Sequence, residues 1–375
     1  MTPSSPADRA ARIHADLPVV DGHNDLPWKL RTTCGGDLVK CDPGGTLEGF
    51  HTDIPRMLEG GVGAQFWSAY VPCGVASPFA RTIEQIDLIE QMAARDHRLA
   101  MAATAHATRT IRASGRIASI IGVEGGHAIE DSLANLDALA DRGARYMTLT
   151  HSDNTSWADS ATDVPEHGGL TDFGRRVIER MNRRGILVDV SHVAAATMRD
   201  ALAASDAPII ASHSNAAALA PHPRNVPDDV LAEIGRRGGV VMAVFFPGFL
   251  VAETAQTMLD LFEQWRRIRS ELDGDEAAIA AEIDRIESGL QVDRGAVADV
   301  ADHVEHIAHV AGVDAVGIGS DFDGMTMTPD GLEDVSCYPA LTEELLRRSW
   351  SEADIRKVLG DNSLRVLAAA EAIAR

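Results

Sequence analysis

The segment DGHNDLPW, residues 21–28, places a histidine and an aspartate two positions apart, directly after an apolar run. On an extended chain, side chains at positions i and i+2 point to the same face, so His23 and Asp25 would converge on one spot. An imidazole nitrogen and a carboxylate oxygen are ligands that Zn²⁺ accepts, but a single such pair is a weak signal. The pair therefore has to be weighed against the polar residues elsewhere in the chain.

Further histidines and acidic residues stand where short apolar runs end. These residues are Glu124, His151, His192, His213, Asp321 and Asp323. If the runs are parallel strands of one barrel, their carboxyl ends open onto a single rim, where the active sites of such enzymes lie. Several carboxylates at one rim repel each other unless cations are present, and a carboxylate such as Glu124 can bridge two ions. The pattern predicts a binuclear zinc site that activates a water and polarises a carbonyl.

The apolar runs that would position these residues alternate with helical segments. Eight stretches rich in Val, Ile, Ala and Gly are expected as strands: 18–25, 63–71, 118–126, 144–152, 185–192, 207–214, 238–246 and 314–324. Between them, apolar residues recur at i, i+3 and i+4 and the segments often end in glycine, which is typical of amphipathic helices. This alternation, with no GxGxxG motif after the first strand, favours an α/β fold of the (β/α)₈ TIM-barrel type over an open doubly wound sheet.

A longer segment, about residues 251–300, separates the seventh and eighth expected strands. Its apolar spacing is helical, and its runs of charge are typical of solvated helix faces. We interpret it as a helical insertion. A chain of 375 residues often forms two domains, but barrels of this type run longer as one unit. We therefore expect one metal-dependent hydrolase barrel domain over residues 1–375.

The composition, with 45% hydrophobic and 24% charged residues, is that of a globular protein. A formal net charge of −22 disfavours nonspecific binding to nucleic acid or to an anionic membrane. The first twenty residues lack the apolar core of a secretory signal, and no apolar stretch is long enough to span a membrane. We expect a cytoplasmic protein with neither nucleic acid nor a membrane as partner.

The chain has four cysteines, and none of them shows the CxxC spacing of a zinc site. They are Cys34, Cys41, Cys73 and Cys337. Free thiols are expected for a protein of a reducing compartment. Cys34 and Cys41 could still close a small loop under oxidising conditions.

Seven motifs occur in a fixed order along the chain: DGHNDLPW, GVEGG, LTHSDNTSWADS, VDVSH, IIASHSN, HPRNVPDD and GIGSDFDG. Together they resemble the renal (membrane) dipeptidase family of binuclear zinc peptidases, and the resemblance covers about residues 16–366. It implies a barrel with two zinc ions per chain and suggests a homodimer. The metal ligands that it implies are His23 and Asp25 for one ion, His192 and His213 for the other, and Glu124 as the bridge.

Three further residues receive roles from this resemblance. His151 would bind the substrate and steady the tetrahedral oxyanion, because it can donate a hydrogen bond to developing negative charge. Arg224 would hold the terminal carboxylate of the substrate, which suits a guanidinium fork. Asp321 would carry a proton from the attacking water to the leaving amine. The expected reaction is hydrolysis of small dipeptides, including those with a D-residue at the carboxyl side, by a metal-bridging hydroxide.

The chain departs from the family pattern at two places. Secreted members carry a cysteine two residues after the histidine of LTH, paired with a partner near the second strand. Here that position is Asp153, and Cys73 is left without that partner, which supports a reducing compartment. A tyrosine that helps to bind the substrate carboxylate in the animal enzymes falls near Phe249, which has no hydroxyl. Substrate preference therefore does not transfer directly from those enzymes.

Two other functions compete with the dipeptidase hypothesis. A related binuclear-zinc amidohydrolase, such as a deacylase or lactonase, could use the same hydroxide on another amide or ester. No lysine stands at an expected strand end, which disfavours the subgroup bridged by a carboxylated lysine. A catalytically silent binding protein is disfavoured by the complete ligand set and by Asp321. Asp323 could support the site or merely cap its loop.

Overall fold

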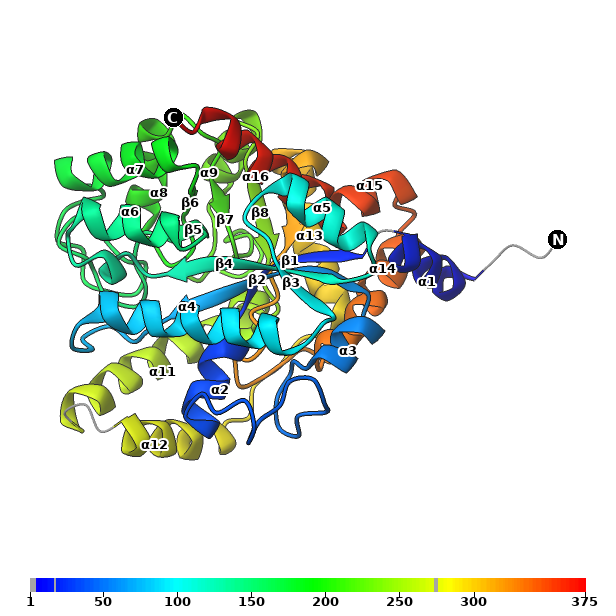
Figure 1. Ribbon diagram of the computed structural model, residues 1–375, viewed down its shortest axis with the longest axis horizontal. Coiled ribbons are helices and arrows are strands. Elements are labelled where there is room, and N and C mark those ends of the chain that lie inside the picture. Colours follow the sequence, from blue (N-terminus) through cyan, green and yellow to red (C-terminus); the bar gives the residue numbers. More distant parts are fainter. Residues whose placement is uncertain (1–4, 17, 273–275) are drawn as a thin grey trace.

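The computed structural model describes residues 5–16, 18–272 and 276–375. Eight parallel strands close into a barrel with helices around it (Figure 1). The strands are β1 (Val19–Asn24), β2 (Val62–Tyr70), β4 (Ile117–Glu124), β5 (Ala144–Thr148), β6 (Leu187–Asp189), β7 (Ile210–Ala211), β8 (Val240–Ala243) and β9 (Val316–Ile318). Each pairs with the next, β9 pairs with β1, and β2 pairs with β4, so the ring is complete. The predicted TIM-type barrel is confirmed.

One additional strand, β3 (Leu99–Met101), runs beside the start of β4 and was not expected from the sequence. Leu99 is buried but Met101 at the other end is exposed, so β3 lacks the continuous burial of the barrel strands. Except for β2, the barrel strands are shorter than the apolar runs that predict them. The residues beyond the strands form loops that carry most of the polar side chains, whereas His23 and Glu124 lie within β1 and β4.

Helices cover the outside of the barrel, because its strands are buried on both faces. They are α1 (Pro6–Asp16), α2 (Leu26–Cys34), α3 (Ile54–Glu59), α4 (Pro78–Arg95), α5 (Ala105–Ala113), α6 (Leu133–Asp141), α7 (Asp172–Arg184), α8 (Ala195–Ala204), α9 (Asp228–Arg236), α13 (Val297–Ala311), α14 (Tyr338–Arg347), α15 (Glu352–Arg356) and α16 (Asn362–Ile373). In α7, the Thr171 hydroxyl accepts the N–H of Gly174, and the helix ends at Gly185, whose φ is 65°. Such polar starts and glycine ends are what the sequence pattern predicts.

The helical insertion predicted between the seventh and eighth barrel strands is confirmed. Between β8 and β9 the chain forms α10 (Pro247–Leu250), α11 (Ala252–Glu271) and α12 (Glu276–Ser288), at the lower edge of the view in Figure 1. Phe262 of α11 packs against Phe249 of α10, with ring centroids 6.2 Å apart. Among the described segments, no helix is both long and apolar enough to cross a membrane.

A disulfide joins Cys34 to Cys41, with Cα atoms 6.3 Å apart, and closes the loop after α2. Gly35 and Gly36 lie at φ values of 65° and 74°, a left-handed turn that folds the chain back between the two cysteines. The expectation of free thiols is therefore wrong for this pair, and the alternative of a small closed loop is confirmed. Cys73 and Cys337 keep their thiols.

Candidate metal and active site

The carboxyl rim of the barrel gathers the side chains that the sequence singled out. His23 lies near the end of β1, and Glu124 is the last residue of β4. The others follow within three residues of β5, β6, β7 and β9, and they are His151, His192, His213 and Asp321. The shared direction of parallel strands thus brings together residues that are far apart in the chain.

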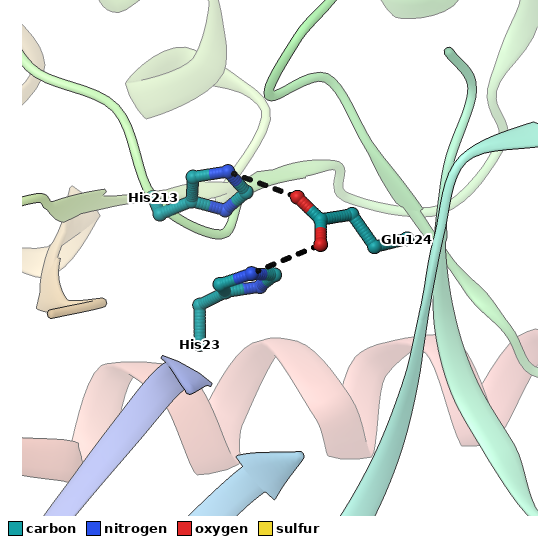
Figure 2. Close-up of side chains that lie close together, drawn as sticks. All are labelled: His23, Glu124 and His213. Atoms are coloured by element: carbon teal, nitrogen blue, oxygen red, sulfur yellow. Dashed lines mark ion pairs between the residues drawn. The ribbon is translucent and has the colours of Figure 1, made fainter. Parts of the chain in front are cut away.

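Glu124 faces both His23 and His213 (Figure 2). Its Oε2 atom lies 3.4 Å from Nε2 of His23, whereas its Oε1 atom lies 3.0 Å from Nε2 of His192 and 3.7 Å from Nε2 of His213. The two oxygens of one carboxylate therefore face different histidines. This arrangement divides the cluster into two halves that share Glu124.

One half contains His23, Asp25 and Asp321. Nε2 of His23 lies 3.2 Å from Oδ2 of Asp25 and 3.9 Å from Oδ1 of Asp321. Within the described part of the chain, the buried Oδ1 atom of Asp25 has no hydrogen-bond partner. Because an unsatisfied buried carboxylate oxygen is costly, this atom is suited to a cation.

The other half contains three histidines. Nε2 of His192 lies 2.8 Å from Nε2 of His213, and Nε2 of His151 lies 3.6 Å from Oε1 of Glu124. His151 also stacks on His192, with ring centroids 4.2 Å apart. Three groups of side chains could each hold a metal ion: Glu124, His151 and His192 in this half, His23, Asp25 and Asp321 in the first half, and His23, Glu124 and His213 across both. The geometry thus also admits His151 as a ligand, and its assignment to the oxyanion stays a prediction.

Burial and charge set the protonation of the central groups. Burial raises the pKa of Glu124, but His23, His192 and His151 more than offset it, so the pKa lies well below its ordinary value. Burial, aided by Arg224, lowers the pKa of His192 to about 4. Burial and the neighbouring charge of His23 place the pKa of His213 well below its ordinary value. For His192 and His213, a neutral imidazole beside an ionised Glu124 is the protonation state that a divalent metal requires. Burial lowers the pKa of His23, but Tyr146, Glu124 and Asp25 more than offset it, so that pKa lies well above its ordinary value.

Asp321 behaves differently from Glu124. Burial, together with the carboxylates of Asp25 and Glu124, raises its pKa well above the ordinary value, although His23 and Arg224 oppose the shift. Its backbone has a φ of 69°, a left-handed conformation that non-glycine residues rarely adopt. His192 and Asp323 share this feature, with φ values of 66° and 65°. Such strain is concentrated at functional sites, where surrounding contacts hold it.

Arg224 is buried, with 1% of its surface exposed. Its Nη1 and Nη2 atoms donate long hydrogen bonds of 3.4 Å to Ser214 Oγ and to the carbonyl of His213. The guanidinium carbon lies 4.9 Å from the centre of the Phe249 ring, and Nε has no hydrogen-bond partner within the described ranges. Burial lowers the pKa of Arg224 to about 10. The group remains a cation with unused donors, as an anion-binding residue requires.

Two residues near the motifs have structural contacts that the sequence does not reveal. Nδ1 of His222 accepts the backbone N–H of Arg224 at 3.1 Å and so shapes the loop that presents the guanidinium. Oδ1 of Asp323 accepts the backbone N–H of His51 at 2.8 Å, while its own N–H donates to His51 Nδ1 at 3.1 Å. Burial raises the pKa of Asp323 to about 6. These contacts hold the loop of Asp323 against the chain at His51, and within the described residues the buried Oδ2 atom of Asp323 has no hydrogen-bond partner.

Sequence reasoning missed the residues that support the ligands from within the barrel. The Ser68 hydroxyl donates to Oε2 of Glu124 at 2.9 Å, and the Tyr146 hydroxyl lies 2.8 Å from Nδ1 of His23. The sequence holds one indication of the place of Tyr146. Gly122, in the neighbouring strand β4, has no Cβ atom, and a Cβ there would collide with the tyrosine ring. A glycine in a buried strand marks such a close approach, but it does not identify the partner.

A model of the family described as membrane dipeptidase (peptidase family M19) matches residues 7–375. The chain belongs to this family. It is 37% identical to dipeptidase 3 of Rattus norvegicus, over 98% of this chain and 68% of that protein. It is 38% identical to dipeptidase verJ of Clonostachys rogersoniana, over 97% of this chain and 87% of that protein. The resemblance inferred from the seven motifs is confirmed, and the chain is an M19 dipeptidase.

Solved structures agree with this assignment. The probable dipeptidase PvdM from Pseudomonas aeruginosa superposes with a TM-score of 0.83 at 25% identity, over 98% of this chain and 99% of that one. A metallo peptidase from Rhodobacter sphaeroides, liganded with a phosphinate mimic of the dipeptide L-Ala-D-Ala, gives a TM-score of 0.76 at 26% identity, over 94% and 99% of the two chains. The M19 dipeptidase described here is thus a hydrolase of a metallopeptidase family.

Proposed function

We propose that this dipeptidase binds two zinc ions, which the residues around Glu124 would hold, and that it hydrolyses small dipeptides that include L-Xaa-D-Xaa. The observation that carries the proposal is the division of the Glu124 carboxylate between His23 on one side and His192 and His213 on the other. The phosphinate mimic of L-Ala-D-Ala on the Rhodobacter sphaeroides relative supports a D-residue at the carboxyl side.

The donor set fits zinc. Imidazole nitrogens and carboxylate oxygens suit this borderline cation, and the unpartnered Oδ1 of Asp25 is a ready ligand atom. We assign His23 and Asp25 to one ion, His192 and His213 to the other, and Glu124 to both. When bound, the zinc pair supplies an activated water nucleophile and polarises the scissile carbonyl.

The chain itself positions the substrate and moves protons. Arg224 pairs with the terminal carboxylate through its unused donors, which fixes the peptide bond over the cluster. Nε2 of His151 donates a hydrogen bond to the carbonyl oxygen as that oxygen gains negative charge. Asp321 accepts a proton from the attacking water and delivers it to the departing amine. The raised pKa of Asp321 suits a group that must hold and then release a proton.

A substrate panel on protein purified without chelator tests this function. The panel contains L-Xaa-L-Xaa and L-Xaa-D-Xaa dipeptides, N-acyl amino acids and lactones, with zinc content measured in parallel. We expect dipeptides to be cleaved best, activity to vanish on chelation and to return with zinc. Faster turnover of N-acyl amino acids or lactones than of dipeptides would favour the deacylase or lactonase function over the dipeptidase function. Activity that survives complete metal removal would refute the zinc mechanism.

A further inference from the structure

Asp189, the last residue of β6, is a fully buried carboxylate three residues before His192. Its Oδ1 accepts the backbone N–H groups of Ser191 at 3.1 Å and Ser212 at 2.8 Å. Its Oδ2 accepts the hydroxyls of Thr148 at 2.6 Å and Ser212 at 2.7 Å. Among these hydrogen bonds none is to a predicted metal ligand, and the resemblance to the family gives Asp189 no role.

Ser212 connects this carboxylate to His213. The serine oxygen lies 2.8 Å from Nδ1 of His213, while the serine proton is donated to Asp189. A hydroxyl has a single proton, so the serine oxygen can interact with the ring only as an acceptor. Nδ1 of His213 must then carry the proton, and its Nε2 is left with a bare lone pair. That Nε2 atom points into the cluster, 3.7 Å from Oε1 of Glu124.

We propose that Asp189 is a positioning residue that acts through Ser212 to hold His213 in its Nδ1–H tautomer, with Nε2 ready for the metal. The inference rests on the zinc site of the proposed function. The chain of contacts runs from carboxylate to hydroxyl to imidazole, so the carboxylate sets the direction of both hydrogen bonds. Partners of this kind, beyond the ligands themselves, typically contribute about 10- to 100-fold in metal affinity.

The structure predicts that Asp189→Asn reverses this chain. Because two backbone N–H groups point at one side of the carboxylate, the amide oxygen must take that side and the NH₂ group must face Ser212. Ser212 then accepts from the amide and turns its own proton toward Nδ1 of His213. The ring is forced into the Nε2–H tautomer, which cannot bind a metal through Nε2. A change of one atom at an unaltered volume should therefore weaken zinc binding.

A matched pair of variants separates positioning from general stability. Ser212→Ala and Thr148→Val each remove one hydroxyl from Oδ2 of Asp189, but only Ser212→Ala removes the acceptor of the His213 ring. Zinc dissociation constants are measured by competition with a chromophoric chelator, and thermal unfolding is followed on the metal-free forms. We expect Ser212→Ala and Asp189→Asn to lower the affinity for one of the two zinc ions by about 10- to 100-fold. Thr148→Val should stay within about threefold of wild type, and equal affinities for Ser212→Ala and Thr148→Val would overturn the inference.

The tautomer of His213 can also be measured in the wild-type protein, which removes any dependence on the folding of the variants. Nitrogen-15 NMR of histidine-labelled, metal-free protein, assigned with His213→Gln, should show a protonated Nδ1 and an unprotonated Nε2. The opposite tautomer would overturn the inference. If the wild-type protein binds no zinc or cleaves no dipeptide, the proposed function fails, whereas the NMR result still decides the role of Asp189.

Discussion

Arg224→Met tests how the site recognises its substrate, because methionine is long and apolar but has no charge. Arg224 has 1% of its surface exposed, and its two terminal nitrogens each donate one long hydrogen bond of 3.4 Å. A substrate carboxylate can therefore bind the guanidinium without breaking strong contacts. Hydrogen bonds to charged groups contribute about 1.5–3 kcal/mol each. A bidentate pair therefore contributes about 3–6 kcal/mol, and its loss should lower kcat/KM by about 10²- to 10⁴-fold.

The assay compares L-Ala-D-Ala with its C-terminal amide on wild type and on Arg224→Met. The wild-type protein should have a higher kcat/KM for the free acid than for the amide, by a similar factor. Arg224→Met should lose this preference, because the substitution lowers kcat/KM for the acid only. Replacing a buried, poorly paired cation by an apolar side chain should leave the melting temperature unchanged or raised, which controls for unfolding. An acid preference that survives in Arg224→Met, or equal wild-type turnover of acid and amide, would refute the assignment of Arg224 as the anchor.

Three further outcomes follow from the geometry. Asp321→Asn should lower kcat by about 10²- to 10⁴-fold while two zinc ions stay bound; since Asp321 Oδ1 lies 3.9 Å from His23 Nε2, loss of zinc instead would make Asp321 a ligand. Burial lowers the pKa of His14 from 6.5 to about 4. As the pH drops from 6.5 to 4, His14 is therefore protonated in the unfolded chain before it is protonated in the folded protein. The free energy of unfolding should fall over this range by about 3 kcal/mol in total. His14→Gln should show a smaller acid-induced fall in Tm, and an unaltered pH profile would contradict this. Thiol titration of the denatured, unreduced protein should find two thiols per chain, whereas four would mean that Cys34 and Cys41 are not paired.

The sequence predicts the fold and most of the candidate site because both depend on patterns that are local. Apolar runs that alternate with amphipathic segments define the barrel, and parallel topology places every strand end at one rim, so His23 and Asp321 meet without any knowledge of distances. The supporting network is different, because it depends on which side chains face each other across strands. Tyr146 and Ser212 look like ordinary members of apolar strands until the barrel is closed. The family resemblance predicts Glu124 as the bridge, but which of its oxygens faces which histidine needs the structure.

The two features that the sequence misjudged are short. Of the three residues of β3 only Leu99 is buried, so the segment lacks the buried apolar pattern that marks the barrel strands, and the Cys34–Cys41 disulfide depends on a left-handed glycine turn between its ends. The disulfide also bears on the predicted cytoplasmic location, since such bonds are rare in a reducing compartment. That location stays a prediction, and cell fractionation together with the thiol titration would test it.

Anomalous diffraction at the zinc edge tests the central claim most directly. Crystals of protein purified without chelator should show two anomalous peaks about 3.5–4 Å apart. One peak should lie between His23, Asp25 and Glu124, and the other between His192, His213 and the second oxygen of Glu124. A single peak, or a pair of peaks that Glu124 does not bridge, would contradict the binuclear site on which the mechanism depends.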